Sequence, residues 1–220
     1  MTQLTVFAPE RLSDALDAFA RGIANDALAS AAFARIRASA DRPADERILL
    51  EAALDLARRF AIPLIDEEPA QAFSWDGRSL RTRSEACVVF HEIAHWQLAP
   101  SDRRALKDFG LGTGPETGRK EEADRDRVVD EQTQIDEECA ASLLGILWEV
   151  ENRGPGLDAF LEQNWLERFD NEGTHRLFGA TVQDLLNRGA IDRTARPVFF
   201  ANGASALNSG THALVFAGVG

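Results

Sequence analysis

The segment His91-Glu92-Ile93-Ala94-His95 places two of the chain's four histidines four residues apart, with a carboxylate beside the first. On an α-helix such residues lie about 6 Å apart on one face, so both imidazoles can bind one ion. The Glu92 side chain is rotated by about 100° from that of His91, so it can contact a metal-bound water without binding the metal. This H-E-x-x-H spacing predicts that His91 and His95 are metal ligands and that Glu92 is a catalytic group.

The sequence around the two histidines is apolar on nearly every side of the expected helix. Its apolar residues are Val88, Val89, Phe90, Ile93, Ala94 and Trp96. Buried imidazoles need partners for their nitrogens, so this context favours a metal over two core histidines bonded to carbonyl groups. Cys87, one turn before His91, is expected to be a packed thiol.

A third ligand must come from elsewhere in the chain, and the acidic start of residues 130–151 offers candidates. Glu138 is the first choice because Ala141 and Ser142 follow it at i+3 and i+4, which leaves room for its side chain to project inward. Glu131 and Glu137 are the alternatives. Two histidines and one carboxylate suit catalytic zinc with an open position, and they suit non-haem Fe(II) equally well.

The elements that must position these residues follow from periodicity and from start and stop signals. We predict a helix-rich α+β fold with a small sheet, in which a hairpin at Asp76-Gly77 flanks the metal-bearing helix in a zincin-like helix pair. The metal-bearing helix is expected to begin at a capping box, Thr82-Arg83-Ser84-Glu85, and to end at Pro100. Further helices are predicted over residues 9–23, 27–38, 43–60, 130–151, 157–169 and 181–188.

Length and composition limit the classes of protein to consider. At 220 residues we expect one domain, with a helical part over 1–62, the metal-site core over 71–152 and a helical and apolar part over 153–220. A net charge of −12 argues against nucleic acid and anionic membranes as partners. No membrane span, secretory leader or disulfide framework is visible, so a soluble, cytoplasmic protein is expected.

One stretch resembles a known family. The H-E-x-x-H helix is followed at once by Trp96, then by the pair Arg103-Arg104, and then by Asp108-Phe109-Gly110. This run is similar to that of the elongation factor P hydroxylases, bacterial non-haem iron enzymes that hydroxylate a modified lysine on that translation factor. The similarity covers roughly residues 75 to 150, and it departs from the family at Gln134-Ile135-Asp136, where the family has Pro-Gln-Ala.

The resemblance implies a hydroxylase that uses Fe(II) and O2 and acts on elongation factor P or on another protein or small-molecule side chain. By it, His91 and His95 are the iron-binding histidines. The family's later acidic residues fall on Glu131 and Glu138, so the choice of third ligand stays open. The residues expected to contact substrate are Arg103, Arg104 and Asp108.

Two other functions fit the same residues. A zinc peptidase would use Glu92 as general base and would need a donor to the oxyanion, commonly Tyr or His. The chain has no tyrosine, which leaves His175, His212 and the two adjacent arginines as donors. A non-catalytic protein with a closed structural zinc site would draw on Cys87 and Cys139. We favour the hydroxylase over the peptidase, and the peptidase over the binding protein.

Overall fold

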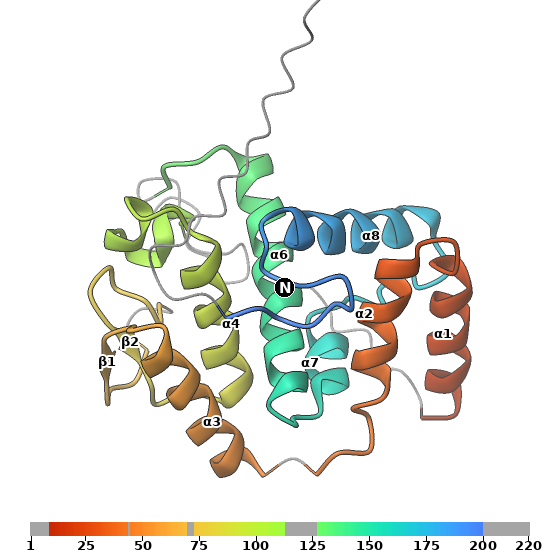
Figure 1. The fold of residues 1–220 in the computed structure, drawn as a ribbon, viewed down its shortest axis with the longest axis horizontal. Coiled ribbons are helices and arrows are strands. Elements are labelled where there is room, and N and C mark those ends of the chain that lie inside the picture. The colour runs from red at the N-terminus through yellow and green to blue at the C-terminus, as the bar shows by residue number, and fades with distance from the viewer. Residues whose placement is uncertain (1–8, 44, 70–72, 113–126, 200–220) are drawn as a thin grey trace, which may run out of the picture.

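The computed structural model describes residues 9–43, 45–69, 73–112 and 127–199 (Figure 1). Within these ranges the chain is helix-rich and has one small two-stranded sheet, as the sequence predicted. None of the described helices has the length and apolar character needed to cross a membrane. The helices are α1 (Pro9–Gly22), α2 (Ala27–Arg37), α3 (Glu46–Arg59), α4 (Ala86–Leu98), α6 (Glu131–Glu151), α7 (Gly156–Glu162) and α8 (Glu172–Asn187).

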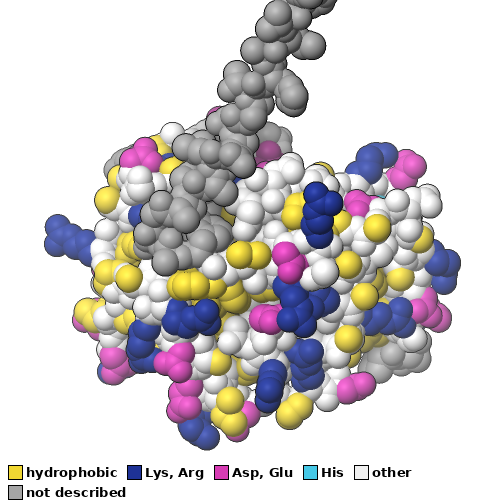
Figure 2. All heavy atoms as spheres, viewed as in Figure 1, with side chains coloured by type: hydrophobic (Ala, Val, Ile, Leu, Met, Phe, Trp, Pro, Cys, Tyr) yellow, Lys and Arg dark blue, Asp and Glu magenta, His cyan; other side chains and the backbone are white. Residues whose placement is uncertain are grey.

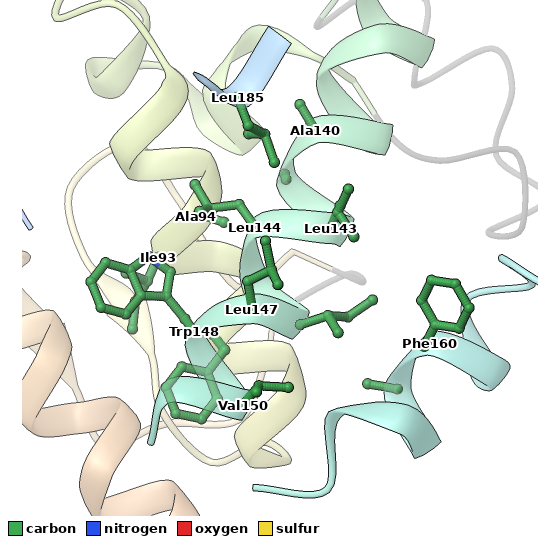
Figure 3. Close-up of a cluster of buried hydrophobic side chains, with 14 of the residues drawn as sticks. Ile93, Ala94, Ala140, Leu143, Leu144, Leu147, Trp148, Val150, Phe160 and Leu185 are labelled. Atoms are coloured by element: carbon green, nitrogen blue, oxygen red, sulfur yellow. The ribbon is translucent and has the colours of Figure 1, made fainter. Parts of the chain in front are cut away.

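Helices α4 and α6 lie side by side at the centre of the molecule and run in opposite directions (Figure 1). Helix α3 and the sheet lie on the α4 side of this pair, and α1, α2, α7 and α8 lie on the α6 side. Buried apolar side chains fill the interior around this pair (Figure 3), among them Ile93 and Ala94 of α4 and Ala140, Leu144 and Leu147 of α6. This core packs α4 against α6.

The start of α4 differs from the prediction. The helix begins at Ala86, and its N-cap residue Glu85 makes no side-chain cap hydrogen bond. The Thr82 hydroxyl instead donates to the Ile65 carbonyl, and the Ala86 N–H donates to the Glu46 carboxylate at 2.6 Å. The capping-box prediction was therefore wrong: a carboxylate from α3 caps α4, because the packing of α3 brings it to the free donors.

The hairpin region adopts the predicted turn and also an unpredicted pairing. Gly77 has φ +89°, the Asp76 carboxylate accepts from two following N–H groups, and an antiparallel bridge joins Trp75 to Leu80. The named strands, β1 (Leu64–Ile65) and β2 (Leu80–Arg81), pair in parallel. The Asp76-Gly77 dipeptide identified the local turn, but the partner of β2 came from an earlier segment of the chain.

The C-terminal helices were predicted with wrong bounds. Helix α7 ends at Glu162, because Asn164 adopts a left-handed conformation with φ +60° that an α-helix cannot continue. Helix α8 begins at Glu172, nine residues before the expected start, and its N-cap residue Asn171 accepts from the Gly173 N–H. It ends just before Gly189, as predicted, with φ +70° at that glycine.

Gly145 sits where α6 touches α4 most closely. A Cβ added there would lie 2.9 Å from the His91 Cα and 3.0 Å from the His91 nitrogen. We expect Gly145→Ala to lower the free energy of unfolding by about 1 kcal/mol, because overpacking against backbone (about 1–3 kcal/mol) outweighs the helix propensity of alanine (about 1 kcal/mol). Urea denaturation measures this difference. An increase in stability would show that the two helices can separate at no cost.

Glu149 is a buried carboxyl group remote from the histidines. It is 5% exposed, and its Oε2 atom has no hydrogen-bond partner among the described residues. Burial, and secondarily the charge of Asp158, raises the pKa of Glu149 to about 7, against 4.5 for an ordinary glutamate. The folded state therefore keeps a proton that the unfolded state releases, and stability falls as the pH rises from about 4.5 to about 7.

We expect Glu149→Gln to be more stable than the wild type at pH 8 by about 3 kcal/mol and to match it near pH 4.5. Urea denaturation at several pH values checks this. Other carboxyl groups titrate in the same window, so the difference between the two proteins isolates the contribution of Glu149. Parallel pH profiles would show that this carboxyl group ionises in the folded protein as it does in the unfolded one.

Candidate metal centre

His91, His95 and Glu138 converge at the junction of α4 and α6. The two imidazole Nε2 atoms are 2.9 Å apart, and Glu138 Oε2 lies 3.6 Å from His91 Nε2 and 3.4 Å from His95 Nε2. Among the described residues, this is the group of side chains able to hold a metal ion. The His95 side chain is 5% exposed and that of Glu138 39% exposed, so the cluster lies at the edge of the core.

The shape of the cluster fits a single ion. The two Nε2 atoms and Glu138 Oε2 form a compact triangle, and a point close to its plane lies about 2 Å from all three. About 2 Å is also the length of a zinc bond to imidazole or carboxylate. The lone pairs of two neutral imidazoles facing each other at this distance would repel, unless one ring carries a proton there or a cation lies between them. The donor set and its spacing therefore suit a divalent metal.

The electrostatics of the cluster also favour a cation. Burial lowers the pKa of His91, but contact with Glu138 and the charges of Glu92 and Asp108 outweigh burial and raise it. For the Glu138 carboxyl group, burial acts to raise the pKa, but the two histidines outweigh burial and hold the pKa well below its usual range. The site thus stabilises an ionised carboxylate beside positive charge, which is what a bound metal requires.

The structure separates the three candidates for the third ligand. Glu137 turns away from the histidines and forms a buried ion pair with Arg103, whose Nη2 lies 2.6 Å from each of its oxygens. Glu131 is the exposed first residue of α6, two turns or about 10 Å of helix axis before Glu138. Glu138, the first choice from sequence, is the one placed with His91 and His95.

Two further carboxyl groups adjoin the cluster. Glu92 is buried, and its Oε2 has no hydrogen-bond partner among the described residues. Burial raises the pKa of Glu92 to about 7, and the neighbouring Glu138 adds to the shift. Burial and the charge of Glu92 raise the pKa of Asp108 to about 7 as well. Both groups can therefore take up or release a proton near neutral pH.

An aromatic wall closes one side of the site. The Phe109 ring stacks on the His95 ring at 5.4 Å, Trp75 stacks on Phe109 at 5.6 Å, and Trp96 meets Trp75 edge-on at 5.0 Å. Asp108 and Phe109 both have positive φ, 47° and 53°, a strained conformation for residues other than glycine. The contribution of Phe109 and Trp75 to the site was not predicted, although Phe109 lies in the Asp-Phe-Gly run that carries the resemblance.

The remaining candidates have other surroundings. Arg103 is committed to Glu137, and Arg104 donates to the Ala99 carbonyl and lies over the Trp96 ring. Their expected role in substrate binding, and that of Asp108, stays a prediction. His175 Nε2 is 2.7 Å from the Phe169 carbonyl and packs on α1, on the other side of α6. His212 lies outside the described residues, and neither cysteine belongs to the cluster.

Comparison with known proteins gives one partial match. A segment of 65 residues is 40% identical to elongation factor P lysine hydroxylase of Haemophilus influenzae, covering 30% of this chain and 33% of that enzyme. The match thus spans a third of the hydroxylase. No protein-family model and no solved structure matches the chain. The similarity indicates relatedness to that hydroxylase over one segment, in agreement with the resemblance seen in the sequence.

Proposed function

We propose that the protein is a non-haem Fe(II) hydroxylase in which His91, His95 and Glu138 hold the metal. The observation that best supports this proposal is the convergence of two imidazoles and one carboxylate, whose ligand atoms lie within 4.8 Å of one another. Two histidines and one carboxylate, with further coordination positions left open, make up the usual ligand set of non-haem Fe(II) oxygenases. The partial match to a lysine hydroxylase supports the same reaction class.

The residues around the ligands have the properties that this chemistry needs. Bound Fe(II) would supply the activation of O2. The wall formed by Phe109, Trp75 and Trp96 keeps water from one side of the site and limits side reactions of the oxidant. In the proposal, Glu92 and Asp108 take up and release protons beside the metal, since both are buried carboxyl groups whose pKa burial raises.

We further propose that the substrate is a cationic side chain on a protein. Glu92 and Asp108 offer carboxyl oxygens beside the ligands, and a chain with net charge −12 attracts positively charged groups. Elongation factor P is the first substrate to test, because the partial match is named for it.

Metal analysis of protein purified anaerobically without chelators tests the proposal. We expect about one equivalent of iron per chain and none in His91→Ala. O2 consumption should then depend on elongation factor P in the wild type and be absent in the variant. If protein fully loaded with Fe(II) consumed no O2 with any lysine-containing protein substrate, the hydroxylase assignment would be abandoned.

One observation supports a zinc peptidase as second candidate. The unpartnered Glu92 Oε2, buried beside His91, suits a general base that activates a metal-bound water. Such an enzyme also needs a donor to the oxyanion, and His175 and Arg103 are both held by other partners. Cleavage of casein by zinc-loaded protein, lost in Glu92→Gln, would favour the peptidase. Oxygen chemistry with iron would exclude it as the main activity.

A further inference from the structure

A second polar site lies at the C-terminal ends of α2 and α6, remote from the histidines. Its pocket, of about 290 Å³, is lined by Arg35, Arg42, Arg153 and Arg196, with Glu151 as the one carboxylate. Glu151 follows Glu138 by almost four turns of α6, which is about 20 Å of helix axis. We propose that this pocket binds a small phosphate-bearing anion.

The arginines come from three parts of the chain that folding brings together. Arg35 lies in the last turn of α2, Arg153 follows α6 with φ +70°, and Arg196 lies in the last described segment. On this face of the molecule, Lys and Arg side chains gather around acidic ones near the middle (Figure 2), where that segment passes α2 and α6. The chain has twelve more acidic than basic groups, so a pocket lined by four guanidinium groups differs in charge from the protein as a whole.

Part of the donor capacity is already used. Glu151 accepts from Arg35 at 2.5 Å and lies 3.6 Å from Arg196, and Arg42 donates to the Val150 carbonyl. The Arg153 backbone N–H donates to the Val150 carbonyl, but its guanidinium group has no hydrogen bond or ion pair with any residue that the structure describes. The Arg35 Nε atom is buried and also lacks a partner among these residues. Donors thus remain for an anion after the internal contacts are made.

The charges do not cancel. A helix C-terminus carries about half a negative charge, so the ends of α2 and α6 together with Glu151 offset about two of the four positive charges. The negative ends of the two helices therefore explain the presence of only some of the four arginines. Asp192 also lies near Arg196, and the charge of its carboxylate offsets part of that of Arg196. About one positive charge is therefore left for a ligand.

The chemistry and size of the pocket identify the class of ligand. Guanidinium groups bind phosphate oxygens through paired, charge-assisted hydrogen bonds. Pockets for drug-sized ligands measure about 300–1,000 Å³, so this pocket is at the small end and suits inorganic phosphate or a small phosphate monoester. A nucleic acid would be repelled by the acidic surface elsewhere on the chain.

Calorimetric titration of the full-length, metal-loaded protein with inorganic phosphate, at constant ionic strength, tests the proposal. We expect saturable binding that Arg153→Gln and Arg196→Gln each weaken about tenfold. Glu151→Gln should tighten binding, because the internal carboxylate competes for the same donors. Arg193→Gln removes the same charge from an exposed residue that does not line the pocket, and it should change the Kd less than about twofold.

Glycerol phosphate binding more tightly than inorganic phosphate would identify a phosphate monoester, and equal binding would identify free phosphate. The proposal is overturned if phosphate gives no more heat than chloride, if Arg193→Gln weakens binding as much as Arg153→Gln, or if succinate binds better. Phosphate bound to the metal would be lost in His91→Ala, whereas binding in the pocket would persist, so this test is independent of the proposed function.

Discussion

Glu138→Gln is expected to weaken metal binding more than about 100-fold. Loss of a partner that only supports a ligand already costs 10–100-fold in affinity, and Glu138 is proposed to supply the one carboxylate oxygen of the cluster. Its neutral amide cannot balance the positive charge beside His91 and His95. Titration of the chelator-treated protein with Fe(II) or Zn(II) in competition with a chromophoric chelator measures the change.

Glu131→Gln is the matched control, since it removes the same charge from the same helix about 10 Å away. It should bind metal like the wild type, and both variants should keep the helical circular dichroism spectrum. Normal affinity in Glu138→Gln, with loss in Glu131→Gln, would move the third ligand to the start of α6. Equal loss in both would indicate that the overall charge of the helix, and not one ligand, governs affinity.

The second large effect is on stability. Glu137→Gln should lower the free energy of unfolding by about 3–5 kcal/mol, because it leaves Arg103 as a buried charge without its partner. Both side chains are only 11% exposed, and Arg103 Nη1 already has no partner among the described residues. Urea denaturation of the metal-free protein measures the loss without a contribution from metal binding.

A double variant distinguishes the charge effect from a loss of packing. With Arg103→Met and Glu137→Met together no buried charge remains, and most of the stability should return, since apolar residues of similar volume can replace a buried ion pair. Glu172→Gln, which breaks the exposed pair with Arg176, should cost less than about 1 kcal/mol. A double variant less stable than Glu137→Gln would show that the ion pair itself stabilises the fold.

These two predictions assign different roles to neighbouring residues of one helix. Successive side chains on a helix diverge by about 100°, so Glu137 and Glu138 face different neighbours. The sequence ranked Glu138 first from the small residues that follow it, but it kept Glu137 as an alternative. The position of Arg103, contributed by the turn after α4, is what engages Glu137 and leaves Glu138 beside the histidines.

The sequence by itself determined the features that depend on local geometry. The spacing of His91 and His95 placed both imidazoles on one helical face, Asp76-Gly77 specified a tight turn, and Gly189 ended α8. These succeed because helix periodicity and turn conformations depend on residues close in the chain. The helix-rich class followed for the same reason.

Only the tertiary structure decided which distant groups meet. Glu46 caps α4 in place of the local capping box, β1 pairs with β2 in parallel, and Phe109 stacks on His95. Each contact joins segments whose mutual orientation is set by the packing of whole helices, which no local pattern encodes. The two histidines could thus be singled out from their spacing, whereas the carboxylate that joins them and the walls of the candidate site depend on how α6 and the turn after α4 pack against α4.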